Sequence, residues 1–204
     1  MGRYGHRKIV KRRPYKLFLI VCEGEKTEPM YFKRYRKRHC NLIIKTPESK
    51  STDPVNLVKF AKEQIKKEEL DLKTGDAIWC VFDCDENTNE NMSRAIKIAG
   101  KDVNICLSNP SFELWFLLHF TSIVSKLFRS EVIEKLKKEI PDYEKNKDVY
   151  DLLVNKREIA LKNAKKLIEL HKKNGINLIS VESNPSTQVC FIAEEILKIT
   201  ECSN

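Results

Sequence analysis

The stretch that decides the fold is Leu17-Phe18-Leu19-Ile20-Val21-Cys22, followed at once by Glu23-Gly24-Glu25-Lys26-Thr27-Glu28. Six consecutive apolar residues that end at turn-forming residues are typical of a strand buried on both faces, as in a parallel sheet. Gly24 permits a tight turn. Thr27 as a cap, with Pro29 in the first turn, then predicts a helix. Strand, turn and helix in this order predict the first half of a βαβ unit.

The same alternation continues to about residue 120. Further strands are expected at 42–45, 77–82 and 103–107. Helices are expected to begin at Asp53-Pro54, to cover 91–99, and to run from Asn109-Pro110 through His119. Strands and helices that alternate at this spacing form right-handed βαβ units. The sequence therefore predicts an α/β fold with a mostly parallel sheet flanked by helices.

Beyond residue 121 the pattern becomes helical. Two helices are expected at 130–140 and 147–173, and we interpret 122–175 as a helical insertion. A strand at 176–181 and a helix at 187–199 then complete the core. The string Ser-Asn-Pro-Ser occurs at 108–111 and again at 183–186, and we expect each copy to start a helix with Asn as cap. The predicted division is a basic arm at 1–14, a core at 15–121, the insertion, and a return to the core at 176–204.

The chain has 204 residues and a formal net charge of +9, which favours an anionic partner. Residues 1–16 carry seven basic residues and no acid, with two interleaved tyrosines. This arm either neutralises phosphates and stacks on bases, or is a solubilising tail. The lysine-rich faces of the insertion are open to the same two interpretations. The candidate phosphate-binding residues of the arm are Arg7, Lys8, Lys11, Arg12 and Arg13.

Other classes of protein fit the sequence poorly. No apolar run approaches the ~20 residues that a membrane helix needs, and the short apolar run after the arm does not make a signal peptide. The seven cysteines are odd in number and include no Cys-x-x-Cys pair. Three of them, at 22, 80 and 106, fall in predicted buried strands. We therefore expect a reduced, cytoplasmic protein without a structural zinc site.

Acidic residues follow two of the predicted strands. Glu23 follows the first, and Asp83 and Asp85 follow the strand at 77–82. Ligands in such sheets bind beyond the carboxyl ends of the strands, so these carboxylates are expected to meet at one edge. Like charges this close repel unless a cation lies between them, and a hard cation such as Mg²⁺ takes oxygen ligands. Ordinary loop acids at a helix N-terminus are the alternative.

The segment 110–120 is apolar apart from Glu113 and His119. A helix that is apolar all round is buried, so the carboxylate of Glu113 needs a partner or a metal there. Its alternative role is to complement the positive end of the helix. For His119 a place in the core or at a cap is favoured over catalysis.

Together these strings resemble the RloB-like family, a branch of the Toprim-fold nucleases associated with phage defence. The resemblance rests on 20–32, on Val81-Phe82-Asp83-x-Asp85, on 107–120 and on Asn184-Pro185-Ser186-Thr187. It implies a Toprim-like sheet with a catalytic site for Mg²⁺ or Mn²⁺ at Glu23, Asp83 and Asp85. Glu113 is implied as a further acid, and Lys26 is a candidate phosphate contact.

The resulting hypothesis is a divalent-metal-dependent endonuclease that cleaves DNA or tRNA. The resemblance implies an antiphage, abortive-infection effector controlled by a partner ATPase. The chain has no Gly-x-x-x-x-Gly-Lys-Ser/Thr string, so that ATPase would be a separate chain. Two alternatives stay open: a non-catalytic nucleic-acid-binding or regulatory subunit, and a phosphatase of the haloacid dehalogenase type with Asp83 as nucleophile. The oligomeric state is open too, and a homo-oligomer is possible.

Overall fold

The apolar runs without helical period form the central strands of a five-stranded sheet. The computed structural model describes residues 15–36, 41–49, 53–84 and 87–201. Its strands are β1 (Lys16–Cys22), β2 (Leu42–Lys45), β3 (Ala77–Asp83), β4 (Asn104–Asn109) and β5 (Ser186–Thr187). Their order is β2-β1-β3-β4-β5, and only the β4–β5 pair is antiparallel. The predicted α/β class with a mostly parallel sheet is confirmed.

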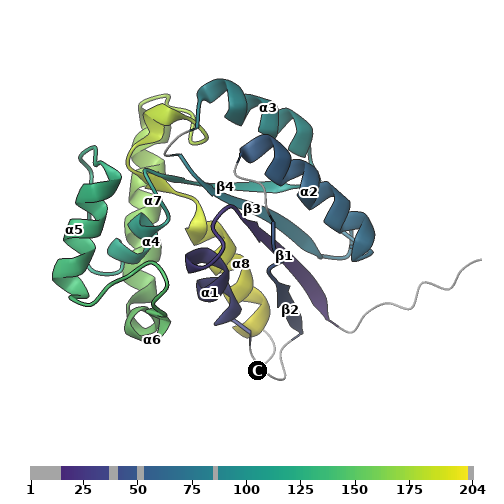
Figure 1. Ribbon diagram of the computed structural model, residues 1–204, viewed down its shortest axis with the longest axis horizontal. Coiled ribbons are helices and arrows are strands. Elements are labelled where there is room, and N and C mark those ends of the chain that lie inside the picture. The colour runs from purple at the N-terminus through teal and green to yellow at the C-terminus, as the bar shows by residue number, and fades with distance from the viewer. Residues whose placement is uncertain (1–14, 37–40, 50–52, 85–86, 202–204) are drawn as a thin grey trace, which may run out of the picture.

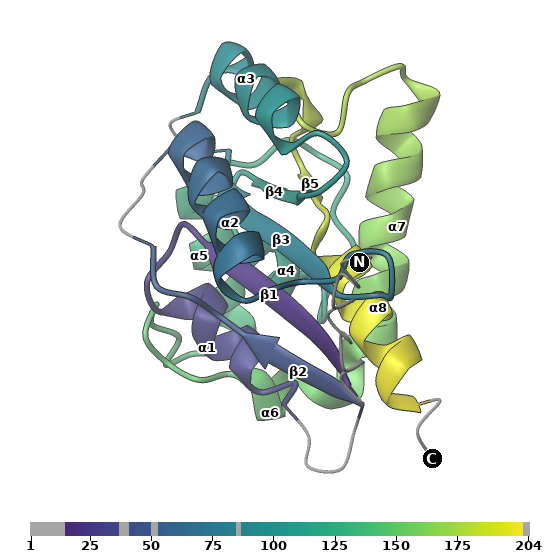
Figure 2. The ribbon, with the colours of Figure 1, turned by 90° about the vertical axis from the view of Figure 1, so that its right-hand side faces the viewer.

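Helices cover both faces of the sheet (Figure 1). They are α1 (Thr27–Lys33), α2 (Pro54–Lys67), α3 (Asn89–Ala99), α4 (Glu113–Leu117), α5 (Arg129–Glu139), α6 (Tyr150–Leu153), α7 (Arg157–Lys173) and α8 (Val189–Glu201). Short 3₁₀ turns lie at Val154–Lys156 and Val181–Ser183. Helices α2 and α3 pack on one face, and α1, α4 and α8 lie on the other (Figure 2). Side chains alternate along a strand. On β1, Leu17, Leu19 and Val21 therefore pack in the core beneath α2 and α3, whereas Phe18 and Ile20 pack in the core beneath α1, α4 and α8.

Local capping accounts for some helix starts and not for others. Asp53 caps α2 by accepting a hydrogen bond from the backbone N–H of Asn56 at 3.0 Å, as predicted. Thr88 caps α3 in the same way through Asn91. The expectation for Thr27 is wrong, because it is the first residue of α1 and its hydroxyl donates to the carbonyl of Lys145. That bond ties the start of α1 to the insertion.

The helices of the insertion pack into one of the two hydrophobic cores. The helix at 130–140 is confirmed as α5, whereas the single helix expected over 147–173 is divided into α6, a 3₁₀ turn and α7. Buried apolar residues of α5 and α7 join the same core as α1, α4 and α8. The insertion residues with the lowest exposure in this core are Val132, Leu136, Ala160 and Ala164.

The expected strand at 176–181 is wrong. Asn177 accepts a hydrogen bond from the backbone N–H of Ile179, and its carbonyl accepts one from the Ser180 hydroxyl, so this segment forms a local turn. The sheet is completed instead by β5, which pairs Thr187 with Ser108 and Ser186 with Asn109.

The two Ser-Asn-Pro-Ser strings are not helix caps. The first ends β4 and the second enters β5, so the two copies pair with each other, and both Asn-Pro bonds are cis. Asn109 donates to the carbonyls of Ser180 and Val181, each at 3.2 Å. Repeated polar residues here form a buried joint between the end of the sheet and the C-terminal segment, because that is where their hydrogen bonds are satisfied.

The predicted burial of Cys22, Cys80 and Cys106 is confirmed, and all three are free thiols. Over the ranges given above, no helix is long and apolar enough to cross a membrane.

Candidate active site

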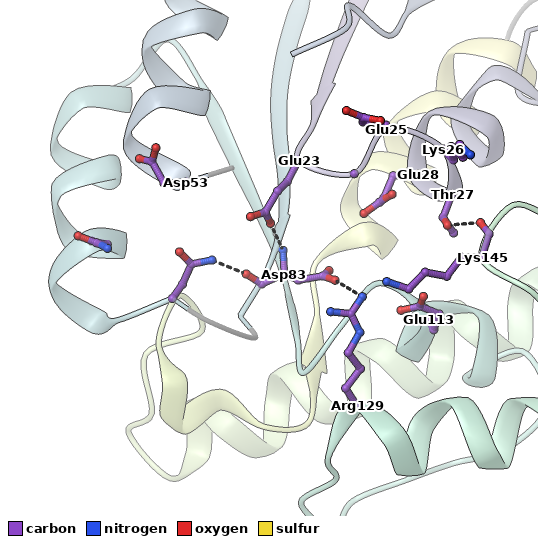
Figure 3. Close-up of a pocket in the computed structure, with 13 residues that line it drawn as sticks. Glu23, Glu25, Lys26, Thr27, Glu28, Asp53, Asp83, Glu113, Arg129 and Lys145 are labelled. Carbon is purple, nitrogen blue, oxygen red and sulfur yellow. Dashed lines mark hydrogen bonds and ion pairs between the residues drawn. The ribbon is translucent and has the colours of Figure 1, made fainter. Parts of the chain in front are cut away.

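The carboxyl edge of the parallel strands carries an acidic pocket of about 610 Å³ (Figure 3). Glu23 follows β1 directly, Asp83 is the last residue of β3, and Glu113 is the first residue of α4, just beyond β4. The structure therefore brings these three predicted residues together. The pocket is lined by Glu23, Gly24, Glu25, Lys26, Thr27, Glu28, Asp53, Asp83, Asn87, Asn91, Glu113, Arg129 and Lys145.

Glu23 and Asp83 are positioned by the sheet. The ladder between β1 and β3 pairs Cys22 with Val81, and the Glu23 N–H continues it by donating to the Val81 carbonyl at 2.9 Å. The Glu23 side chain then turns to β3, where Oε2 accepts a hydrogen bond from the Asp83 N–H at 3.1 Å. Asn87 donates to the carbonyl of Asp83 at 2.8 Å. Backbone hydrogen bonds thus fix the position of both acids before any ligand is present.

The Asp83 carboxyl is buried among other acids. Burial raises its pKa well above the ordinary value, repulsion from Glu28, Glu113 and Glu23 adds to the rise, and Arg129 opposes it. The Arg129 guanidinium lies 3.8 Å from Asp83 Oδ2. The other oxygen, Oδ1, is buried and has no hydrogen-bond partner. An unsatisfied carboxylate oxygen is costly, so this atom points to a ligand that the pocket is built to receive.

Glu28 is another acid of the pocket; from the sequence it is a secondary candidate beside Glu23, or a residue that stabilises the first turn of the following helix. It is 7% exposed, and burial raises its pKa to about 7, with Glu113 and Glu23 contributing to the rise and Lys145 opposing it. Gly24 makes room for it: a Cβ at Gly24 would lie 2.1 Å from Glu28 Oε2. Gly24 therefore does more than permit a turn, because its missing side chain leaves the space that the Glu28 carboxyl occupies.

Glu113 is buried with hydrogen-bonding partners. Its Oε2 accepts a hydrogen bond from the Ser111 hydroxyl at 2.7 Å, and its Oε1 lies 3.5 Å from the Tyr143 hydroxyl. Burial raises the pKa of Tyr143, and the charge of Glu113 adds to that rise. Because neutral hydroxyls hold both oxygens, Glu113 keeps a fixed orientation toward the pocket (Figure 3).

Two cations enter the pocket from the insertion, and sequence reasoning missed both. Arg129 begins α5, and Lys145 lies in the loop between α5 and α6. The hydrogen bond from Thr27 to the Lys145 carbonyl holds this loop beside α1. Figure 3 shows both side chains directed toward Asp83 and Glu113. No local pattern distinguishes them from the many other basic residues of the insertion, because the contact with Asp83 spans 46 positions of sequence.

A model of one protein family, described as RloB-like protein, matches residues 18–196. The chain belongs to this RloB-like family. Comparisons with curated proteins and with solved structures each gave no match. The matched region contains most of β1, all of the insertion and most of α8, so the pocket and the insertion are parts of one family domain.

The other predicted site residues of this RloB-like protein fall in three groups. Asp85 and the arm residues Arg7, Lys8, Lys11, Arg12 and Arg13 lie outside the described residues. Lys26 lines the pocket and is exposed. His119 is buried away from the pocket, with Nδ1 2.9 Å from the Trp115 carbonyl, and burial lowers its pKa to about 4. His119 is therefore a core histidine, as favoured from the sequence.

The fit of a metal ion can be judged from the donors. All the carboxyl groups offer oxygen, the donor that Mg²⁺ and Mn²⁺ prefer, and the unpartnered Asp83 Oδ1 adds an available ligand atom. Among the described residues, no group of three or more Asp, Glu, His or Cys side chains is already arranged to hold an ion. The donor chemistry of Glu23 and Asp83 fits a hard cation, and Asp85, the third predicted ligand, lies outside the described residues.

Proposed function

We propose that this RloB-like protein is a divalent-metal-dependent endonuclease. The observation that carries the proposal is the set of buried carboxyl groups at the carboxyl edge of the sheet, one with an unpartnered oxygen, in a chain of net charge +9. A basic protein gains affinity for polyanions from its surface, and it gains nothing from burying acids together unless a cation uses them. Acidic pocket and basic surface together suit metal-assisted cleavage of a phosphodiester.

Within this proposal the acids have separate roles. Glu23, Asp83 and Asp85 would hold Mg²⁺ or Mn²⁺, which when bound polarises the scissile phosphate and stabilises developing negative charge. Glu28, with a pKa of about 7, is the carboxyl best matched to exchanging a proton near neutral pH. Glu113 is held by hydrogen bonds with Ser111 and Tyr143 and keeps its carboxyl directed toward the pocket. General acid–base catalysis is thereby assigned to Glu28.

The basic residues of the pocket would bind the nucleic-acid backbone. Arg129, Lys145 and the exposed Lys26 all line it, and contacts from arginine and lysine to phosphate fix the register of a strand without reading its sequence. Arg129 pairs with Asp83 when no ion is bound, and a metal on Asp83 would leave the guanidinium available to phosphate.

The biological setting is part of the same proposal. The family resemblance supports an antiphage effector that acts on DNA or tRNA in the cytoplasm under the control of an ATPase on a separate chain. Without that partner, the purified protein would bind nucleic acid but cut it slowly.

The test is cleavage of total tRNA and of plasmid DNA by purified protein with Mg²⁺ or Mn²⁺. Glu23→Gln and Asp83→Asn should each lower the rate by at least about 100-fold, since each removes a ligand charge. Glu25→Gln is the matched control, because Glu25 lines the same pocket but is exposed. Equal rates in all four proteins would contradict the proposal. Tight nucleic-acid binding without cleavage, even with the partner ATPase added, would favour a binding subunit, and a phosphorylated Asp83 would favour a phosphatase.

A further inference from the structure

An exposed phenylalanine stands next to the arginine of the acidic pocket. Phe128 is 70% exposed, the highest value for a large apolar side chain among the described residues. It directly precedes Arg129, whose guanidinium reaches Asp83. Arg129 lines the pocket, so Phe128 is the chain neighbour of a pocket residue.

The backbone that carries Phe128 is held from both sides. The neighbouring Leu127 is buried, and its N–H and carbonyl are both bonded by the Asn184 side chain, at 2.9 Å and 2.8 Å. The Phe128 N–H donates to the Glu131 carboxylate at 2.7 Å, and its carbonyl accepts from Val132 at 3.1 Å. These bonds make Phe128 the N-cap residue of α5, so its backbone is fixed by the start of that helix. The side chain is therefore presented to solvent by a fixed backbone.

The surroundings of Phe128 select an anionic, aromatic ligand. Lys126 and Arg129 flank it within two residues on either side, and Lys145 lines the same pocket. An aromatic ring beside cations is the arrangement with which proteins bind single-stranded nucleic acids: the cations contact phosphates and the ring stacks on a base. A base within a duplex has both faces stacked already, so only an unpaired base can use such a ring.

We propose that Phe128 stacks on an unpaired base next to the phosphate bound over the acidic pocket. The proposal rests on the proposed nuclease function and adds a substrate class to it, namely a single-stranded segment, loop or end. It also gives a role to Asn184 of the second Ser-Asn-Pro-Ser string, whose side chain holds the backbone of Leu127, the residue before Phe128.

The experiment measures binding of oligonucleotides that carry the fluorescent base 2-aminopurine. The full-length protein would carry Asp83→Asn to prevent cleavage, and RNA and DNA would be tested as single strands and as duplexes. In this background Phe128→Ala should weaken single-strand binding by about 10-fold or more and abolish the fluorescence quenching that stacking causes. Phe128→Trp should retain both. Val124→Ala is the matched control, since Val124 is 55% exposed in the same segment and should bind as the parent does.

Each of the other outcomes overturns the inference. Phe128→Ala that binds and quenches like the parent would show that the ring does not stack. A change of oligomeric state in light scattering, with unaltered oligonucleotide binding, would assign Phe128 to a protein interface. Equal losses for single strands and duplexes would assign it to backbone binding. Failure of the nuclease proposal is seen separately: the protein without Asp83→Asn would then cut no nucleic acid, whereas cutting that survives Phe128→Ala unchanged removes only the stacking role.

Discussion

Replacing Glu28 by glutamine should stabilise the metal-free protein, by an amount that grows as the pH rises from about 4.5 to about 7. The pKa of Glu28 rises from an ordinary 4.5 to about 7, chiefly because the side chain is buried. One pKa unit corresponds to about 1.4 kcal/mol, so keeping Glu28 ionised in the folded protein costs about 3 kcal/mol. Because the folded-state pKa is the higher one, this cost is absent below about pH 4.5, grows as the pH rises, and is complete above about pH 7.

The assay is thermal unfolding in a chelating buffer at pH 5 and pH 8. For a chain of this size about 3 kcal/mol corresponds to roughly 6–12 °C in Tm, so Glu28→Gln should gain that much at pH 8 and little at pH 5. Glu25→Gln, on the exposed part of the same loop, should stay within about 0.5 kcal/mol of the parent at both pH values. A loss of stability at pH 8, or the same gain at both pH values, would refute the argument from burial.

Three further predictions follow from single contacts. Gly24→Ala should fold but displace the Glu28 carboxyl, because the new Cβ would lie 2.1 Å from it, and a carboxyl-carbon NMR titration should show the Glu28 pKa moving down from about 7. Asn184→Ala should cost about 1–3 kcal/mol in urea unfolding, because it leaves the buried Leu127 backbone without two hydrogen bonds; an unchanged midpoint would contradict this. The ring signals of His119 should not titrate between pH 5 and 8, since its pKa is lowered to about 4.

The central strands and the meeting of the acids could be predicted from the sequence. β1 and β3 are each buried on both faces, and unbroken apolar runs that alternate with helices are typical of the strands of a parallel sheet. Once those strands are parallel neighbours, Glu23 and Asp83 must share an edge, because both follow carboxyl ends. The prediction needed only the local pattern and the handedness rule for βαβ units.

The errors came from asparagine residues whose hydrogen-bond partners the sequence pattern does not reveal. Asn177 lies among apolar residues that suggest a strand, but its local hydrogen bonds make a turn. Asn109 and Asn184 have the sequence context of helix caps, yet Asn109 bonds carbonyls more than 70 positions away and Asn184 bonds Leu127. An asparagine side chain that can cap a helix can equally bond a remote backbone, and tertiary structure decides between the two.

The pocket's charge balance gives the insertion its place in the mechanism. Six acids line one pocket, and two of the cations that line it with them, Arg129 and Lys145, belong to the insertion. The insertion also shares the buried core formed by α1, α4 and α8, so it cannot be removed without opening that core. Under the proposed function, the sheet therefore supplies the carboxylates for the metal while the insertion supplies the positive charge for phosphate. A change in the position of α5 would alter both the charge on Asp83 and the approach of the substrate, because Arg129 and Phe128 are adjacent residues at its start.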